Sequence, residues 1–229
     1  MKKIPQISIC FLMVFCMLLL FASRCKKVDT NEEANNFTDS RDGNNYKTVK
    51  IGNQVWLAEN LKYLPSIAGP EIGSRTTPYY YVYDYNGTSI EDAKATVNYK
   101  TYGVLYNWEA AKVACPKGWH LPSDEEWKQL IDYLGGGDVA GGKLKEIGTT
   151  LWNSPNTEAT DVVGFTALPG GRRNYNGEFV NIRDFGLWWC ATELYTNLAF
   201  LRGMAYDGGY VSNLEDDKAV GLSVRCVKD

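Results

Sequence analysis

Apolar residues recur at helical spacing in two segments near the middle of the chain, which predicts two amphipathic helices. The first helix should end at Cys115. The second should begin after Ser123, because Ser123 and Glu126 have the spacing of a capping box, in which each side chain accepts a hydrogen bond from the other residue's backbone N–H. Its core face is predicted to hold four apolar residues: Trp127, Leu130, Ile131 and Leu134. The run of glycines that starts at Gly135 should end this helix.

Alternating apolar and polar residues predict strands before and after these helices. Residues 46–51 and 54–57 should form a hairpin. Tyrosines alternate along residues 79–85, so one strand face there would be all tyrosine, either to stack on sugars or as a half-buried sheet face. Residues 88–100 should form a polar loop. Three strands should close the chain, at residues 186–193, 199–206 and 220–227. This pattern predicts a sheet-rich α+β domain.

Residues 1–24 have the three parts of an export signal: a basic start, an apolar run and small residues before a cysteine. The apolar run, over residues 7–21, is shorter than the ~20 residues that a spanning helix needs. The segment resembles the lipobox of bacterial lipoproteins, in which Cys25 would be the lipidated first residue of the mature chain. Arg24 departs from that pattern, because a small residue is usual before the cysteine. Ordinary secretion with cleavage nearby is the alternative.

Residues 25–41 are polar and hold almost no apolar groups, which predicts a disordered tether. The folded domain should cover residues 42–229, a length sufficient for one domain with its own core. Its abundance of tyrosine and tryptophan argues against disorder. Loss of residues 1–24 would take the formal net charge from −3 to −6, and no basic patch is visible. We therefore do not expect nucleic acid as a partner.

Three cysteines remain once the signal and Cys25 are set aside, and an exported chain can keep disulfides. Cys115 and Cys226 form the preferred pair, which would join the end of a helix to the last strand. Cys190 lies in an apolar segment without cationic neighbours, which indicates a buried free thiol. His120 is the only histidine, so a histidine-rich metal site is excluded and a structural role is expected for it. We expect no metal and no cofactor.

The long segment over residues 149–185 holds the candidate ligand-binding residues. A hairpin turn is expected at Asn176-Gly177. The residues just before that turn combine two guanidiniums, an amide and an aromatic ring: Arg172, Arg173, Asn174 and Tyr175. Such a group can engage carboxylates, sugars or peptide. The alternative interpretation is a solvated hairpin shoulder that binds nothing.

Several short motifs occur in a fixed order over nearly all of residues 42–229: Asp42-Gly43-Asn44 with Tyr46, residues 51–56 with Glu59-Asn60-Leu61, residues 102–108, residues 115–122, Gly164-Phe165, Trp188-Trp189 and residues 221–227. This set resembles the Fibrobacter succinogenes major paralogous domain family of exported proteins and lipoproteins. The resemblance implies a C-type lectin-like fold, in which two helices flank antiparallel sheets and the chain ends are paired. In that fold a cysteine at a helix end bonds to one in the last strand, which fits the Cys115–Cys226 pair.

An enzyme is not expected. Residues 121–127 are close to a helix start found in the formylglycine-generating enzymes, which resemble this fold, but capping and packing explain that segment. Those enzymes use a nearby pair of cysteines, whereas Cys190 and Cys226 are far apart in sequence. Calcium-dependent lectins of this fold carry Glu-Pro-Asn or Gln-Pro-Asp and Trp-Asn-Asp motifs, which this sequence lacks. Residues 215–217 are therefore read as a solvated acidic turn rather than a cation site.

Two functions remain open. The first is a binding module, tethered to an outer membrane or cell surface through a lipid anchor, that uses its long loop region on an unknown glycan or envelope protein. The second is a structural or assembly component of the cell envelope or of an adhesive surface structure. An exposed aromatic patch on residues 79–85 would favour the second.

Overall fold

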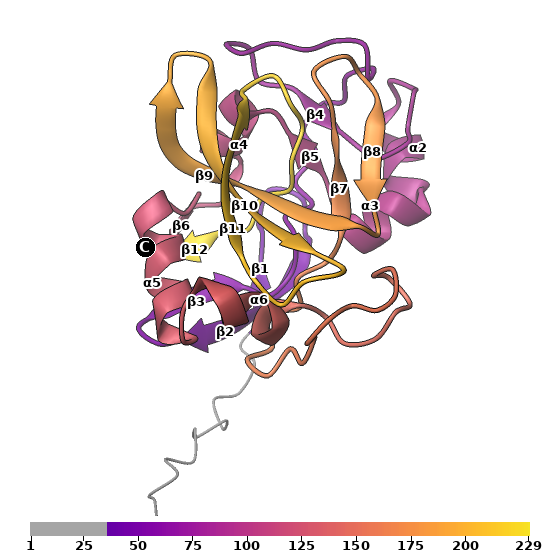
Figure 1. The fold of residues 1–229 in the computed structure, drawn as a ribbon. Helices are drawn as coiled ribbons and strands as arrows, with labels where there is room; N and C mark the ends of the chain where they lie inside the picture. The colour runs from indigo at the N-terminus through magenta and orange to yellow at the C-terminus, as the bar shows by residue number, and fades with distance from the viewer. Residues whose placement is uncertain (1–35) are drawn as a thin grey trace, which may run out of the picture. The chain divides into compact units, whose positions relative to one another are not determined.

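The computed structural model describes residues 36–229, and these form an α+β domain with mostly antiparallel sheets (Figure 1). The expected signal segment, Cys25 and most of the expected tether lie outside the described residues. The largest sheet has the strand order β1-β2-β3-β12-β6. Its strands are β1 (Asn36–Thr38), β2 (Asn45–Ile51), β3 (Gln54–Leu57), β6 (Trp119–His120) and β12 (Val227–Lys228). The predicted hairpin over residues 46–57 is confirmed as β2 and β3.

Three smaller sheets complete the β structure. A three-stranded sheet has the order β11-β10-β9, and β4 pairs with β5 and β7 with β8. These strands are β4 (Tyr80–Tyr81), β5 (Leu105–Tyr106), β7 (Gly170–Arg173), β8 (Phe179–Ile182), β9 (Phe185–Tyr195), β10 (Leu198–Ala205) and β11 (Ser212–Asp217). The predicted strands over residues 186–193 and 199–206 are confirmed as β9 and β10. The predicted strand over residues 220–227 is mostly isolated bridges that lead into β12.

Five helices lie among the described residues: α2 (Ile90–Ala95), α3 (Val97–Tyr102), α4 (Trp108–Ala114), α5 (Asp124–Tyr133) and α6 (Gly137–Leu144). α4 and α5 are the two helices predicted from periodicity. At the start of α5 the hydroxyl of Ser123 accepts from the Glu126 N–H, and the Glu126 carboxylate accepts from the Ser123 N–H, so the capping box is confirmed. None of the helices in residues 36–229 is long and apolar enough to cross a membrane.

Two expectations for residues 79–100 are wrong. The segment with alternating tyrosines is extended only at Tyr80–Tyr81, and both of these side chains are buried. The expected polar loop over residues 88–100 instead holds α2 and most of α3, which are capped by the side chains of Ser89 and Thr96. The strand face made only of tyrosines that alternation predicted is therefore absent from this segment.

The core has two main clusters, and both are rich in aromatic rings. One packs α4 against β9 and β10 around Tyr106 and Trp189. The other packs the apolar face of α5 against Trp56, Phe165 and Trp188. All four residues predicted for that face, from Trp127 to Leu134, are buried.

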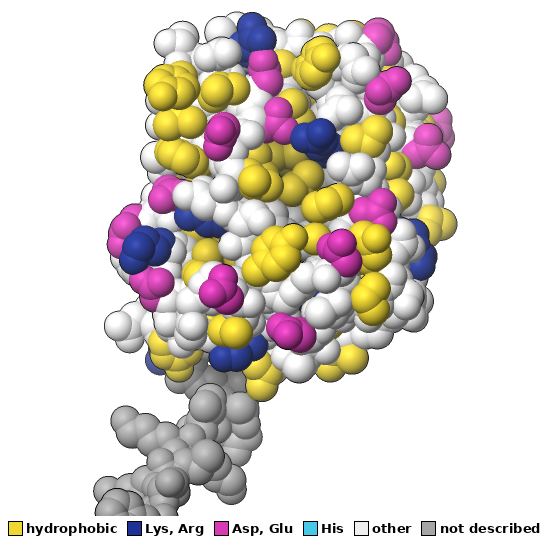
Figure 2. Space-filling view, viewed as in Figure 1, with side chains coloured by type: hydrophobic (Ala, Val, Ile, Leu, Met, Phe, Trp, Pro, Cys, Tyr) yellow, Lys and Arg dark blue, Asp and Glu magenta, His cyan; other side chains and the backbone are white. Residues whose placement is uncertain are grey.

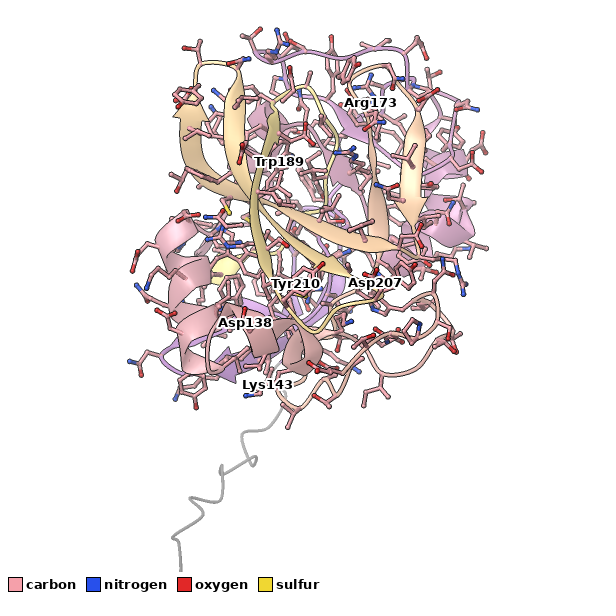
Figure 3. The ribbon with its side chains drawn as sticks, in the orientation of Figure 1. Asp138, Lys143, Arg173, Trp189, Asp207 and Tyr210 are labelled. Carbon is pink, nitrogen blue, oxygen red and sulfur yellow. A yellow bond between two sulfur atoms is a disulfide. The ribbon has the colours of Figure 1, made fainter. Side chains whose placement is uncertain are left out.

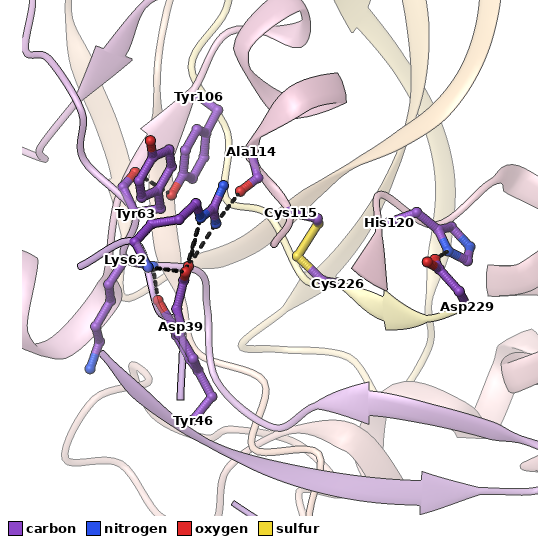
Figure 4. Close-up of a disulfide and its surroundings, with 11 residues drawn as sticks. Asp39, Tyr46, Lys62, Tyr63, Tyr106, Ala114, Cys115, His120, Cys226 and Asp229 are labelled. Atoms are coloured by element: carbon purple, nitrogen blue, oxygen red, sulfur yellow. Dashed lines mark hydrogen bonds and ion pairs between the residues drawn. A yellow bond between two sulfur atoms is a disulfide. The ribbon is translucent and has the colours of Figure 1, made fainter. Parts of the chain in front are cut away.

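The ends of the described chain meet in the largest sheet, because β12 lies between β3 and β6. Cys115, which caps the end of α4, is bonded to Cys226 just before β12, so the predicted disulfide is present (Figure 4). Residues 36–41 were predicted to belong to the disordered tether, but they are folded, and β1 pairs with β2. The buried carboxylate of Asp39 accepts from Arg41. The Nη2 of Arg41 also donates to the Ala114 carbonyl at 2.8 Å. The domain therefore begins before residue 42.

Candidate functional site

The β7–β8 hairpin carries the four residues predicted to contact a ligand. β7 and β8 pair through Arg172 with Val180 and Arg173 with Phe179. The Asn174 N–H donates to the Glu178 carbonyl at 2.8 Å and closes the turn. Gly177 has φ +93°, and a Cβ there would lie 2.6 Å from the Pro70 carbonyl oxygen, so glycine lets the turn rest on the neighbouring loop. The turn predicted at Asn176-Gly177 is confirmed.

Arg173 is not available to a ligand, because its side chain is fully buried under the hairpin (Figure 3). Its Nε donates to the Pro70 carbonyl at 2.8 Å and its Nη1 to the Ala219 carbonyl at 2.9 Å. The guanidinium also lies 4.7 Å from the centre of the Tyr81 ring. Burial lowers the pKa of Arg173, against the raising effect of Tyr81 and Glu71. The prediction that this residue is a ligand contact is corrected: it holds together the loops beneath the hairpin.

Arg172 is half-buried and bonded to β11, since its Nη1 lies 2.7 Å from the Asp216 carboxylate. Arg75 forms a similar ion pair with the next residue of β11, and its Nε lies 2.8 Å from the Asp217 carboxylate. The expected solvated acidic turn at residues 215–217 is therefore part of a strand, and two of its carboxylates are engaged by arginines. Within residues 36–229 no three His, Cys, Asp or Glu side chains are grouped as metal ligands.

Tyr175 is the most exposed of the four predicted contact residues, with 73% of its surface exposed at the tip of the hairpin. Half-buried Asn174 precedes it, and exposed Asn176 and Glu178 follow. The Asn176 amide donates to the Glu178 carboxylate at 2.8 Å, which orders the polar groups beside the ring. An exposed ring with ordered amide and carboxylate groups can stack on an apolar face of a ligand and hydrogen-bond its polar edge.

The hairpin packs against the loop that contains Pro70 and Ile72, which was not predicted from the sequence. Pro70 accepts from Arg173, and Ile72, beside it, is an exposed apolar residue. The Tyr81 hydroxyl donates to the Ile72 carbonyl at 2.7 Å, so this loop is held from below. Tyr83 packs on Phe179 of β8, with ring centres 5.2 Å apart. The sequence gives only a weak indication of this loop, the pair Gly69-Pro70 followed by mostly polar residues.

His120 lies between two carboxylates, of which Figure 4 shows that of Asp229, near the disulfide. Its Nδ1 is 2.7 Å from Asp229 and its Nε2 is 2.8 Å from Glu126, the capping-box residue of α5. Burial is the largest single influence and lowers the pKa of His120, but the hydrogen bonds and charges of Asp229 and Glu126 together raise it above its usual value. This arrangement agrees with the structural role expected for His120, which links β6 to the start of α5 and to Asp229, the residue after β12.

We expect His120→Gln to flatten the pH dependence of stability above pH ~6.5. Because the pKa of His120 is raised on folding, its charge stabilises the fold fully below the unfolded pKa, and that contribution is lost as pH rises through the folded pKa. The pair is partly exposed, so the effect should stay below about 1 kcal/mol. Urea denaturation at several pH values measures it. An equal decline of stability with pH in both proteins would contradict the role of His120, which is the chain's single histidine.

Cys190 is a free thiol that is fully buried, as predicted. Burial raises its pKa to about 12, against the lowering effect of Arg202. The thiolate that nucleophilic or redox chemistry requires is therefore scarce near neutral pH.

The comparisons with known proteins give one match. A family model described as the Fibrobacter succinogenes major domain matches residues 49–228, which is most of the chain. No curated protein and no solved structure matches the chain.

Proposed function

The chain belongs to the Fibrobacter succinogenes major domain family, and from that membership we propose that it is a non-catalytic binding module of the cell envelope, built on a C-type lectin-like fold. Three features support this fold: α4 and α5 lie beside antiparallel sheets, a disulfide joins a helix end to the last strand, and the terminal strands share one sheet.

The proposed contact surface is the tip of the β7–β8 hairpin, and the exposure of Tyr175 is the observation that carries it. The hairpin is fixed by Arg173 below and by the Arg172–Asp216 ion pair at its side. A ring held on a fixed support loses little conformational freedom on binding, which favours affinity. The ligand in this proposal is a glycan or a protein of the envelope.

The proposed location rests on the sequence of residues 1–25. A basic start, an apolar run and small residues before Cys25 support export and lipidation of that cysteine, and so a lipid anchor in an outer membrane or at a cell surface. Two structural facts support a role without catalysis of the formylglycine-generating type. Cys226 is held in a disulfide, and the pKa of the buried Cys190 thiol is raised.

We expect the full chain to bind on a glycan and peptide array, and Tyr175→Ala to weaken that binding about tenfold, the loss of about 1.4 kcal/mol that an aromatic contact can supply. Tyr195→Ala is the matched control, because Tyr195 is also exposed, at 63%, and lies where β9 ends. Equal loss in both variants, or in neither, would contradict a site at the hairpin tip.

Absence of any binding from a folded sample would favour the alternative, a structural or assembly component of the envelope. The feature expected to mark that role was an aromatic patch on residues 79–85. In the structure Tyr80, Tyr81 and Val82 are buried, and Tyr79, Tyr83 and Tyr85 are half-buried.

A further inference from the structure

A shallow hollow lies apart from the hairpin tip, between α6 and the loop over residues 156–162. Its volume is about 310 Å³. Its lining combines two valines, a backbone glycine, a hydroxyl and two opposite charges: Val139, Gly142, Lys143, Glu158, Thr160 and Val162. Both valines are exposed. Apolar surface together with a few polar groups in a concavity is typical of a small-ligand site.

Two glycines of α6 allow neighbouring loops to approach the helix backbone closely. A Cβ at Gly142 would lie 2.5 Å from the Glu158 carbonyl oxygen, and one at Gly141 would lie 2.2 Å from that of Tyr210. The Gly142 N–H donates to the Gly209 carbonyl at 2.8 Å, and the Thr160 N–H donates to the Gly142 carbonyl at 2.7 Å. Two separate loops therefore contact the backbone of one helix turn, which fixes their positions relative to each other.

The loop over residues 156–162 holds three non-glycine residues in the left-handed region. Asn156, Glu158 and Asp161 have φ values of 49°, 60° and 42°. Such conformations cost free energy and persist where the surroundings impose them. The Asn156 amide donates to the carbonyls of Glu146 and Gly148, and the Asp161 carboxylate accepts from Thr166. The Glu158 side chain lies against Gly209 of the 206–211 loop. Residues in left-handed conformations cluster at functional sites.

Lys145 supports the 206–211 loop from beneath. Its buried ammonium donates to the carbonyls of Ala205 at 2.9 Å and Gly208 at 2.8 Å. Burial lowers the pKa of Lys145 to about 8, against the raising effect of Asp207 and Glu158. The loop that carries Tyr210 is thus fixed at its start by charge-assisted hydrogen bonds.

An aromatic ring and a carboxylate meet on two consecutive glycines of this loop. A Cβ at Gly208 would lie 2.2 Å from the Tyr210 ring, and one at Gly209 would lie 2.0 Å from the Glu158 carboxylate. Tyr210 is 45% exposed and lies between Asp138 and Asp207 (Figure 3). Apolar and acidic side chains alternate over this face (Figure 2). The Glu158 carboxylate, which lines the hollow, therefore lies against the same pair of glycines as the Tyr210 ring.

We infer that this hollow is a second binding site, and that it takes a pyranose sugar ring, with Tyr210 of the adjoining 206–211 loop as a further stacking face. The C–H face of a pyranose suits Val139, Val162 and the Tyr210 ring. The Lys143 ammonium already donates to the Leu134 carbonyl at 2.6 Å, which leaves two of its three N–H groups for a ligand. Pyranose hydroxyls both donate and accept, so one ligand can donate to the Glu158 carboxylate and accept from the Lys143 ammonium. A ligand with a single charge would satisfy only one of the two. The site is separate from the hairpin tip and does not depend on it.

The test is a titration of the isotope-labelled full chain with methyl pyranosides of glucose, mannose, galactose and N-acetylglucosamine, followed by backbone amide shifts. We expect at least one sugar to shift the amides of Gly142 and Gly209 with a Kd on the order of millimolar, as the size of the ligand dictates. Glu158→Gln and Val162→Ser should each weaken binding about tenfold. Both side chains are exposed, so the variants should fold. Glu215→Gln, an exposed acid on β11, is the matched control and should bind like the wild type.

No shift at Gly142 and Gly209 with any sugar up to about 50 mM would overturn the inference. So would shifts that Glu158→Gln and Val162→Ser leave unchanged. The alternative ligand is a cation that would pair with the Glu158 carboxylate alone, and lysine amide tests it. Shifts with lysine amide but not with the sugars would also overturn the pyranose assignment. Tyr175→Ala separates the two sites: it should weaken array binding at the hairpin about tenfold and leave the sugar shifts at Gly142 intact. Either proposal can therefore fail without the other.

Discussion

Replacing Cys115 and Cys226 together by serine should lower the free energy of unfolding by about 4–5 kcal/mol. The disulfide closes a loop with a sequence separation of 111 residues, so its loss returns a large conformational entropy to the unfolded chain. It also links α4 to β12, so the last strand and its place beside β3 depend on it. Urea denaturation of the full chain, followed by tryptophan fluorescence, measures the change.

Reduction provides the matched control for this prediction. In excess reductant, the wild type should unfold at the same urea concentration as the double serine variant. The reductant should not change the unfolding midpoint of the variant itself. Cys190 is free and buried in both proteins, so it contributes nothing to the difference. A variant as stable as the oxidised wild type would show that the bond constrains little of the unfolded chain.

Arg225→Met should be strongly destabilising, with an expected loss of about 3–5 kcal/mol. The guanidinium is fully buried, and its two terminal nitrogens donate to four acceptors. These are the carbonyls of Leu57, Phe165 and Thr166 and the side chain of Asn60. Burial lowers the pKa of Arg225 to about 9, and Asp161 and Glu59 oppose that change. Methionine fills a similar volume but leaves these acceptors without a donor.

Arg172→Met is the control for Arg225→Met. Arg172 is half-buried in an ion pair at the edge of the hairpin, so its loss should cost less than about 1 kcal/mol. Arg225→Lys should restore only part of the stability, because an ammonium cannot reproduce the planar fork of donors. Equal denaturation midpoints for Arg225→Met and Arg172→Met would contradict the prediction that Arg225 contributes more to stability than Arg172.

Local chemistry made several elements predictable. The capping box at Ser123 and Glu126 is a contact between residues three apart, so the sequence displays it directly. The β2–β3 hairpin and the Asn176-Gly177 turn are equally local. The Cys115–Cys226 bond is not local, but few cysteines were left to pair, and the family resemblance implied the same bond.

Short elements without apolar periodicity escaped prediction. α2 and α3 have six residues each, and their few buried side chains, Ala93, Tyr99 and Tyr102, make no helical stripe. Helices this short are stable only through tertiary packing, which a local pattern does not contain. β11 is acidic and largely exposed, so nothing in its sequence alternates. It is a strand because its backbone pairs with β10.

The candidate site was predicted in part. Tyr175 is exposed as a contact residue must be, whereas Arg173, its neighbour but one, is buried. Arginine is rarely buried without partners. The partners of Arg173 are the carbonyls of Pro70 and Ala219, 103 and 46 residues away in the sequence, so the sequence could not display them. The sequence did not predict the hollow beside α6 either, because the hollow forms only where α6 and the loop over residues 156–162 come together in the fold.

The short strand β1 has a mechanical consequence. Tension applied through the residues before Asn36 would reach the open end of the β1–β2 hairpin, whose three residue pairs would separate one after another, beginning with Asn36 and Lys47. Phe37, stacked on Trp119 with ring centres 5.2 Å apart, would be pulled away next. Asp39 and Arg41, bonded to each other and to the end of α4, would then carry the load directly to the disulfide-linked core. We therefore expect β1, which only three residue pairs hold to β2, to separate under tension before the disulfide-linked core is loaded.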